Sequence, residues 1–473
     1  MVRTRFAPSP TGSLHVGNAR IAVLNWLFTR QQRGQFALRV EDTDAARNVE
    51  GAEHQLMEDL TWLGLDWDEG PTLAGTARGG HGPYRQTERL SLYREYAEKL
   101  LASGHVFRCY CTDAELEAAR SVALARGEQP HYPGTCRRAS AAQRSAWEAE
   151  GRRAALRFEV KPDEDIVVRD IVYGDVHVRS DDIGDFIVLR SDGWPTYNFA
   201  VVVDDVLMEI THVIRGVGHL SNTPRQIVLY QALAHEPPAF AHIPMVLGAD
   251  RQKLSKRHGA QALADYRREG YHPDALVNYL SLLGWSSPSG EEFLSREQLI
   301  AEISLERIGN ADVIFDPVKL SWLSAKHIDA MPIDALVAAV QPFVDRDRFP
   351  LSDVHLAIAV AATRTHLTKF ADINEQLAAF YPDREPAPSP APAVVRAARE
   401  KLIEVAAWDD DAQLGQAIKN AGHAAGAKGK ALYEPLRLAL TGREHGPPFT
   451  AVLRVQGRER VLERLRVAAG DAE

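Results

Sequence analysis

Apolar and polar positions in the first hundred residues follow the period of a strand in some segments and that of a helix in others. A broad apolar helical face covers residues 19–28, and Gly34 is placed to end that helix. Residues 36–40 alternate with the period of a strand, and helical faces return at about 53–63 and after 82–89. Strands that alternate with helices predict a parallel sheet of the α/β class.

This alternation is interrupted and then resumes. The interrupting region contains two Glu- and Ala-rich helical patterns and one short strand pattern, at 114–126, 141–153 and 155–160. Strand patterns return at 186–190, 209–215 and 241–247, with an apolar run at 199–203. Asn222 and Pro224 indicate a helix that starts with a cap residue and a proline in its first turn. We therefore expect an insertion between two halves of one α/β domain.

From residue 260 onward the pattern is helical, and beyond 326 it contains almost no strand signal. A Pro-rich joint at 382–392 divides this last part into two helical halves. The expected segments are a first α/β half (1–94), an insertion (95–185), a second α/β half (186–259), a helical region (260–325) and a helical C-terminal region (326–473).

Composition is that of an ordinary globular protein, with 45% apolar and 25% charged residues among 473, which excludes wholesale disorder. The net charge of −9 argues against a general nucleic-acid binder, although residues 396–473 carry slightly more Lys and Arg than Asp and Glu. The apolar runs are far shorter than the roughly 18 residues of a membrane span. The first residues lead directly into the motif described next, which leaves no room for a signal peptide, so we expect a cytoplasmic location.

The motif occupies residues 5–18, Arg-Phe-Ala-Pro-Ser-Pro-Thr-Gly-Ser-Leu-His-Val-Gly-Asn. Pro8 and Pro10 stiffen a turn, and Gly12 and Gly17 allow a phosphate to approach the backbone closely. The positive end of the following helix points back at this turn, where His15 lies. Such a corner suits a polyphosphate, whereas the alternative is a solvated turn before an amphipathic helix.

A second motif, Lys253-Leu-Ser-Lys256-Arg257, follows the strand pattern at 241–247. Alone it could be a solvated basic loop. In this order, the two motifs resemble the HIGH and KMSKS signatures of class I aminoacyl-tRNA synthetases, and Ala-Pro-Ser-Pro-Thr-Gly-x-Leu-His-x-Gly is the variant of the glutamyl/glutaminyl branch. Over nearly its whole length the chain resembles the bacterial-type glutamyl-tRNA synthetases.

The resemblance implies a class I Rossmann-type parallel sheet, interrupted by an acceptor-binding insertion and followed by a stem-contact region and an all-α anticodon-binding region. It also implies ligation of L-glutamate to tRNA(Glu) in two steps that use ATP with Mg²⁺, by a monomer without membrane contact. His15, Lys253 and Lys256 match the catalytic positions. The ATP-binding positions are Pro10, Thr11, Gly12, His15, Gly17, Asn18, Lys253, Ser255, Lys256 and Arg257.

The implied glutamate-binding positions are Arg5, Ala7, Ser9, Glu41, Tyr197 and Arg215. Arg5 and Arg215 suit the pairing of carboxylates, and Glu41 suits an ammonium group. Each arginine alone could instead form a surface salt bridge, and Thr43 or Asp44 after Glu41 could cap a helix. Because Glu41 and Arg215 both end strand patterns, we expect them at the same edge of the sheet.

Cys109, Cys111 and Cys136 are the three cysteines, and their spacing resembles the zinc knuckle of the family's insertion. Where many relatives have His or Tyr as a fourth ligand, this chain has Arg138, which cannot bind zinc. Tyr132 matches the Tyr-x-x-x-Cys arrangement of a shorter glutamylating relative, and His131 is the chemically easier ligand. Three reduced cysteines without metal are the alternative.

Other departures and alternatives stay open at this point. After Arg215-Gly216, relatives continue with Glu-Asp, and this chain has Val217-Gly218, which is compatible with a tRNA-binding paralogue of reduced activity. A truncated relative that glutamylates a tRNA base, an enzyme that also charges tRNA(Gln) and an unrelated nucleotidyltransferase are further alternatives. Near the C-terminus, 428–437 and 441–443 resemble anticodon-domain segments, and Arg364 lies near a position that reads the anticodon.

Overall fold

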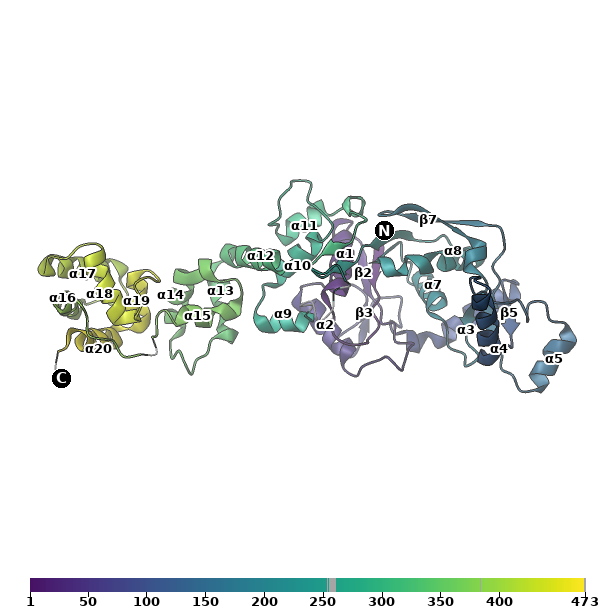
Figure 1. Ribbon diagram of the computed structural model, residues 1–473, viewed down its shortest axis with the longest axis horizontal. Helices are drawn as coiled ribbons and strands as arrows, with labels where there is room; N and C mark the ends of the chain where they lie inside the picture. Colours follow the sequence, from purple (N-terminus) through teal and green to yellow (C-terminus); the bar gives the residue numbers. More distant parts are fainter. Residues whose placement is uncertain (253, 255–260, 383, 472–473) are drawn as a thin grey trace. The chain divides into compact units, whose positions relative to one another are not determined.

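The structure is a computed structural model that describes residues 1–252, 254, 261–382 and 384–471 (Figure 1). It divides into two compact units. The N-terminal unit comprises residues 1–265 and 277–316, and the C-terminal unit comprises 266–276 and 317–473. Each unit has its own core of buried apolar side chains.

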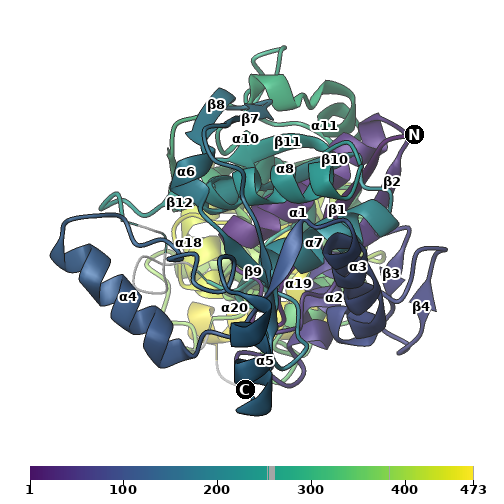
Figure 2. The same ribbon diagram turned by 90° about the vertical axis from the view of Figure 1, so that its right-hand side faces the viewer.

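Parallel strands of the N-terminal unit form the predicted α/β framework. β1 (Arg3–Phe6) pairs in parallel with β2 (Gln35–Leu38), and β10 (His212–Gly216) pairs in parallel with β11 (Ala239–Ile243). The Thr211 amide just before β10 donates to the Arg3 carbonyl in β1 at 2.9 Å, which links the two pairs. Helix α1 (Val16–Gln31) packs on β1 and β10, and α8 (Thr223–Ala232) packs on β7 (Asp165–Asp170) (Figure 2). The α/β prediction is confirmed.

Gly34 follows α1 but does not end it in the way that the sequence suggested. The helix ends at Gln31, and the left-handed residue after it is Arg33, with φ of 50°. A Cβ atom on Gly34 would lie 2.3 Å from the Val2 carbonyl oxygen. This glycine is therefore needed because the chain passes against the start of β1, not because of its φ angle.

Several other predictions of element ends were wrong for identifiable reasons. The strand predicted at 209–215 begins only at His212, because Glu209 has a left-handed φ of 53°. The strand predicted at 241–247 is divided at Pro244 into β11 and β12 (Val246–Leu247), as expected where a residue lacks a backbone donor. Asn222 makes no side-chain capping bond to α8, whereas Pro224 does lie in its first turn. The apolar run at 199–203 belongs to helix α7 (Tyr197–Leu207).

The region 95–185, whose limits stay a prediction, contributes to two sheets. β5 (Val106–Cys109), β6 (Ala155–Phe158) and β9 (Phe186–Leu189) form an antiparallel sheet. The hairpin of β7 and β8 (Gly174–Arg179) instead extends the sheet of β10 and β11, because β7 pairs in parallel with β11. Helices α4 (Asp113–Ala125) and α5 (Ala141–Ala149) begin with capping boxes and bury none of their residues.

The remaining described elements complete both units. In the N-terminal unit they are α2 (Ala52–Trp62), β3 (Gly70–Pro71), β4 (Ala77–Arg78), α3 (Leu90–Ala102), α6 (Ser180–Ile183), α11 (Arg296–Glu302) and β13 (Val313–Ile314), and the unit boundary crosses α9 (Leu263–Glu269) and α10 (Pro273–Leu282). The described part of 317–471 contains helices and no strand: α12 (Pro317–Ala330), α13 (Ile333–Val340), α14 (Asp353–Thr363), α15 (Ile373–Leu377), α16 (Pro392–Ile403), α17 (Asp411–Ala425), α18 (Lys430–Thr441), α19 (Phe449–Gln456) and α20 (Arg458–Ala469). The predicted all-α C-terminal region is confirmed.

Candidate functional site

One cavity of about 620 Å³ lies beyond the carboxyl ends of β1 and β10 in the N-terminal unit. This is where ligands bind in open parallel sheets. The cavity is lined by all six residues predicted to bind glutamate, which are Arg5, Ala7, Ser9, Glu41, Tyr197 and Arg215. The structure therefore brings together side chains that are more than two hundred residues apart in the sequence.

Arg5 is held by a carboxylate that the sequence analysis did not identify. Its Nε lies 3.1 Å from Oδ1 of Asp205 and its Nη2 lies 3.4 Å from Oδ2, and both residues are buried. Arg39, which is also fully buried, donates to Asp205 Oδ1 at 2.6 Å. Burial disfavours the charged form of Asp205, but the guanidinium groups of Arg39 and Arg5 outweigh it and lower its pKa. The positive charge of Arg5 is thus compensated inside the protein.

Glu41 is a buried carboxylate in the wall of the cavity. Its Oε1 accepts a hydrogen bond from Nη2 of Arg39 at 3.1 Å. Burial raises the pKa of Glu41 above its usual range, although Arg39 and Arg5 partly offset this effect. A ligand ammonium group at this carboxylate would favour its ionised form.

Arg215 has only neutral partners among the described residues. Its Nη2 donates to Thr223 Oγ1 and Gln226 Oε1, both at 2.8 Å, and its Nε donates to Nε2 of His242 at 3.1 Å. Its Nη1 is buried without a hydrogen-bond partner. Burial lowers the pKa of Arg215 from its ordinary value. An anion placed at Nη1 would satisfy the unpaired donors and compensate the charge.

Tyr197 and His219 close another side of the cavity. The Tyr197 hydroxyl and Nδ1 of His219 are 2.9 Å apart. Burial raises the pKa of Tyr197 to about 12 and lowers that of His219 to about 4. Both side chains are therefore neutral near pH 7, and they add hydrogen-bonding groups without net charge.

A second cavity of about 550 Å³ begins at the N-terminus of α1. Its lining includes His15, Gly17, Asn18, Val217, Gly218 and Leu254. Asn18, Ile21, Gly216 and His219 line both cavities, so the two share a wall. Of the other predicted ATP-binding residues, Thr11 lines the first cavity, whereas Pro10 and Gly12 line neither.

The lysine-bearing motif can be placed only in part. Lys253, Ser255, Lys256 and Arg257 lie outside the described residues. Leu254 lines the second cavity together with His15. Beyond the motif, Leu263 donates from its amide to the Leu14 carbonyl at 2.9 Å. Leu254 within the motif and Leu263 beyond it thus lie near the N-terminal corner.

The three cysteines form a compact group. Their Sγ atoms lie within 4.8 Å of one another, and those of Cys111 and Cys136 are 3.5 Å apart. Tetrahedral zinc with Zn–S bonds of about 2.3 Å separates its sulfur ligands by roughly 3.8 Å. Burial raises the pKa of Cys111 to about 12, whereas at Cys109 the nearby Arg157 outweighs burial and lowers the pKa.

Tyr132 lies closer to this group than His131 does. Its hydroxyl is 3.8 Å from Sγ of Cys109 and 3.9 Å from that of Cys111, and it accepts a hydrogen bond from the Cys136 amide at 2.7 Å. His131 does not belong to the cluster of possible metal ligands found among the described residues, and its ring lies against Gly184. The three thiols suit a soft metal ion, and the Tyr132 hydroxyl is the nearest further donor described here.

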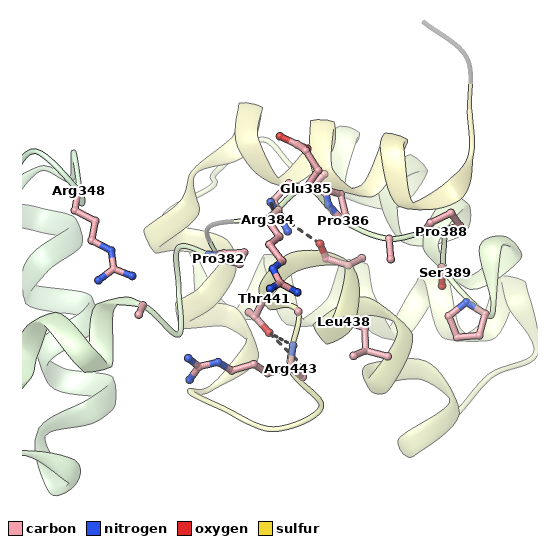
Figure 3. A pocket seen from close by; sticks show the side chains of 16 residues that line it. Arg348, Pro382, Arg384, Glu385, Pro386, Pro388, Ser389, Leu438, Thr441 and Arg443 are labelled. Carbon is pink, nitrogen blue, oxygen red and sulfur yellow. Dashed lines mark hydrogen bonds between the residues drawn. The ribbon is translucent and has the colours of Figure 1, made fainter.

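The C-terminal unit contains a cavity of about 540 Å³ between the Pro-rich joint and the end of α18 (Figure 3). Four of its lining residues are arginines, namely Arg348, Arg384, Arg443 and Arg464. Arg464 is buried and donates to the carbonyls of Ala439 and Arg384, both at 3.2 Å. The joint therefore forms one wall of a basic cavity.

Outside this cavity, Arg364 donates to the Met331 carbonyl at 2.9 Å and to the Asp329 carbonyl.

Sequence reasoning missed several buried residues behind the cavities, chiefly Asp205, Arg39 and His242. Their contacts join segments that are distant in the sequence, so no local pattern identifies them. The pair Asp204-Asp205, directly after the apolar run at 199–203, was the available signal, because buried carboxylates need cationic partners.

Comparisons with known proteins agree with this arrangement. Residues 1–322 match the family "tRNA synthetases class I (E and Q), catalytic domain", and residues 335–469 match "Anticodon binding domain". A glutamate–tRNA ligase of Carboxydothermus hydrogenoformans is 44% identical over 97% of both chains, and one of Heliobacterium modesticaldum is 43% identical over 99% of this chain and 97% of its own. A crystal structure of a glutamate tRNA ligase from Elizabethkingia meningosepticum in complex with its amino acid superposes with a TM-score of 0.88 at 29% identity, covering all of both chains. In the part of the chain that the structure describes, no helix has the length and apolar composition of a membrane span.

Proposed function

The chain belongs to the class I tRNA synthetases of the glutamyl/glutaminyl branch, and on that premise we propose that it ligates L-glutamate to tRNA(Glu) at the expense of ATP. The observation that carries this proposal is a single cavity whose lining includes the buried side chains of Arg5, Arg215 and Glu41, beside a second cavity at the N-terminus of α1. Glutamate carries two carboxylates and one ammonium, and the charges of the first cavity are complementary to them. The second cavity provides the helix N-terminus that binds phosphates.

In the first step a carboxylate oxygen of glutamate attacks the α-phosphorus of ATP, and pyrophosphate leaves. In the second step the terminal ribose of tRNA displaces AMP from the adenylate. Neither step requires a nucleophile from the protein, so catalysis depends on positioning and on compensation of phosphate charge. We assign the phosphate contacts to His15 and the amides of the α1 N-terminus, and the cations to Lys253 and Lys256. Mg²⁺ would accompany ATP, held mainly by its phosphates.

The glutamate contacts follow from the charges in the cavity. Arg215, with Nη1 unpaired, and Arg5 bind carboxylates, Glu41 binds the ammonium, and Tyr197 donates a neutral hydrogen bond. Glutamine would leave a buried cation without compensation, and this disfavours glutamine against glutamate.

We propose that Cys109, Cys111, Cys136 and Tyr132 hold a zinc ion. The sulfur spacing and the position of the Tyr132 hydroxyl support this ligand set. Zinc at such a closed site is structural and would stabilise the segment between Cys111 and Cys136.

The C-terminal unit is proposed to bind the tRNA, since residues 335–469 match an anticodon-binding domain. Exposed arginines such as Arg443 would pair with RNA phosphates. We further propose that the protein acts as a monomer in the cytoplasm.

Aminoacylation of purified tRNA(Glu) and tRNA(Gln) with radioactive glutamate tests the function directly. We expect charging of tRNA(Glu), abolished by removal of ATP and reduced at least about a hundredfold in Arg215→Ala, as for loss of a buried charged contact. Charging of both tRNAs would identify a non-discriminating enzyme. Binding of tRNA without charging would contradict the proposal and would indicate the paralogue suggested by Val217 and Gly218.

A further inference from the structure

Behind Arg215 lies a buried chain of polar groups that the proposed reaction does not use directly. His242 in β11 places Nε2 3.1 Å from Nε of Arg215, and its Nδ1 lies 2.6 Å from Oδ2 of Asp170 at the end of β7. The side chains of Asp170 and His242 are both completely buried. Carboxylate, imidazole and guanidinium are thus hydrogen-bonded in succession, and Arg215, the last of them, lines the first cavity.

The hydrogen bonds of Asp170 determine which group donates and which accepts between Asp170, His242 and Arg215. Its Oδ1 accepts from the amides of Val172 and Tyr173, both at 2.9 Å, and its Oδ2 accepts from the His242 amide at 3.1 Å. An acceptor held in this way requires the proton of the imidazole to be on Nδ1. Nε2 of His242 is then bare and accepts from Arg215, whose Nε can only donate.

A neutral imidazole, in place of a carboxylate, has a specific advantage as the acceptor of the hydrogen bond from Arg215. Arg5 is bound directly by Asp205, and part of its charge is therefore unavailable to a ligand. Arg215 is oriented by His242, Thr223 and Gln226 without a carboxylate in contact. Its charge stays uncompensated, and two N–H groups of Nη1 remain for a ligand.

We propose that Asp170 and His242 are positioning residues, which orient Arg215 toward a carboxylate of the amino-acid substrate while leaving its charge for that substrate. Asp170 belongs to the β7–β8 hairpin, which lies within the predicted insertion at 95–185. The hairpin therefore supports the amino-acid cavity from behind. The proposal rests on the proposed function for the identity of the ligand.

Calorimetric titration with glutamate and steady-state kinetics of the full chain test it together. In His242→Phe, which keeps the ring but removes both hydrogen bonds, we expect the Kd and KM for glutamate to rise about tenfold or more, as for loss of a hydrogen bond to a charged group. The KM for ATP should change less than about twofold. His242→Gln, whose amide oxygen can accept from Arg215, should recover most of the affinity.

Asp170→Asn gives a second test that does not depend on His242→Phe folding. Its amide would donate to Nδ1 and drive the ring proton to Nε2, where it opposes the Nε–H of Arg215, so glutamate binding should again weaken about tenfold. His212→Gln, in the same strand as Arg215 but outside the chain of hydrogen bonds, is the matched control. Thermal unfolding of each variant separates instability from lost orientation.

Each outcome has a defined meaning. Unchanged glutamate affinity in folded His242→Phe or Asp170→Asn would overturn the positioning role, as would equal losses for glutamate and ATP. If the parent protein binds glutamate with this dependence on His242 but does not charge tRNA, the inference stands and the proposed function fails. Absence of glutamate binding by the parent would overturn both.

Discussion

Arg5 and Arg215 line the same cavity, but their charges are compensated differently. Arg5 forms a buried ion pair with Asp205 at 3.1 Å, whereas the partners of Arg215 are a hydroxyl, an amide and an imidazole. A buried cation without a counterion is costly, and a ligand carboxylate removes that cost. The sequence gives no reason to expect the charges of the two arginines to differ in their compensation. The difference comes from the residues that contact each of them.

The protonation of His242 should be visible in the pH dependence of stability. Burial lowers the pKa of folded His242, with Arg215 opposing protonation and Asp170 favouring it, while Thr223 faces the ring without charge. Below about pH 6.5 the unfolded chain takes up a proton that the folded ring does not, so stability falls as pH falls. We expect this loss, up to about 1.4 kcal/mol per pH unit for one proton, to be smaller in His242→Gln. Urea unfolding of both proteins between pH 7.5 and 5 measures it, and parallel profiles would refute it.

The metal proposal makes its own prediction at the residue scale. Purified protein should contain about one zinc per chain. Cys136→Ser should lose it, because structural zinc needs four ligands and the proposed site provides only three thiolates and a phenol. Elemental analysis and a chelator-dependent fall in thermal midpoint report the change. His131→Ala is the control and should keep the metal. Loss of zinc in that variant and not in Tyr132→Phe would identify histidine as the fourth ligand.

At the scale of elements, periodicity located most helices and strands but not their ends. β10 starts only at His212, after Glu209, whose backbone is left-handed. The predicted strand at 241–247 is divided by Pro244. Neither effect changes the periodicity of apolar and polar positions, so the sequence pattern does not reveal it. Gly34 was interpreted as a helix terminator because glycine often ends helices, whereas its role depends on Val2, a contact that appears only after β1 and β2 pair.

Gly34→Ala should therefore be strongly destabilising. Its Cβ would lie 2.3 Å from the Val2 carbonyl oxygen, and the Gln35 amide already donates to that oxygen at 2.9 Å. We expect a loss of about 2–3 kcal/mol, the upper range for overpacking. Gly80→Ala, where an added Cβ has no heavy atom within 4 Å, is the control and should change stability by less than about 0.5 kcal/mol. Equal denaturation midpoints for the two variants would contradict this interpretation.

At the scale of the whole molecule, the class of fold could be predicted from the sequence, and so could the meeting of Arg5, Glu41 and Arg215 in one cavity. Motif residues at the ends of parallel strands meet because the topology of the sheet requires it. The supporting residues could not be predicted, since Asp170 and His242 meet only when β7 pairs with β11. The exact limits of the five predicted segments stay predictions, and so do the roles of Lys253 and Lys256, which lie outside the described residues.

Separate cores predict that the two units respond separately to mutation. Leu436 in α18 and Leu229 in α8 are both fully buried, one in each core. Leu436→Ala should destabilise the C-terminal unit by about 2–5 kcal/mol and leave the KM for glutamate unchanged, whereas Leu229→Ala should destabilise the N-terminal unit. Scanning calorimetry with and without glutamate separates the two transitions. A single transition that both substitutions shift equally would show that the chain unfolds as one cooperative block.

Asn18, Ile21, Gly216 and His219 belong to the walls of both cavities in the N-terminal unit. One molecule can therefore occupy both compartments at once. If glutamate and ATP bind as proposed, an inhibitor that joins a glutamyl head to adenosine through a linkage resistant to cleavage would bind its second half at high effective concentration. Such a bisubstrate compound should exceed the affinity of either fragment by orders of magnitude, and shortening or lengthening its linker would measure how far apart the two compartments hold their ligands.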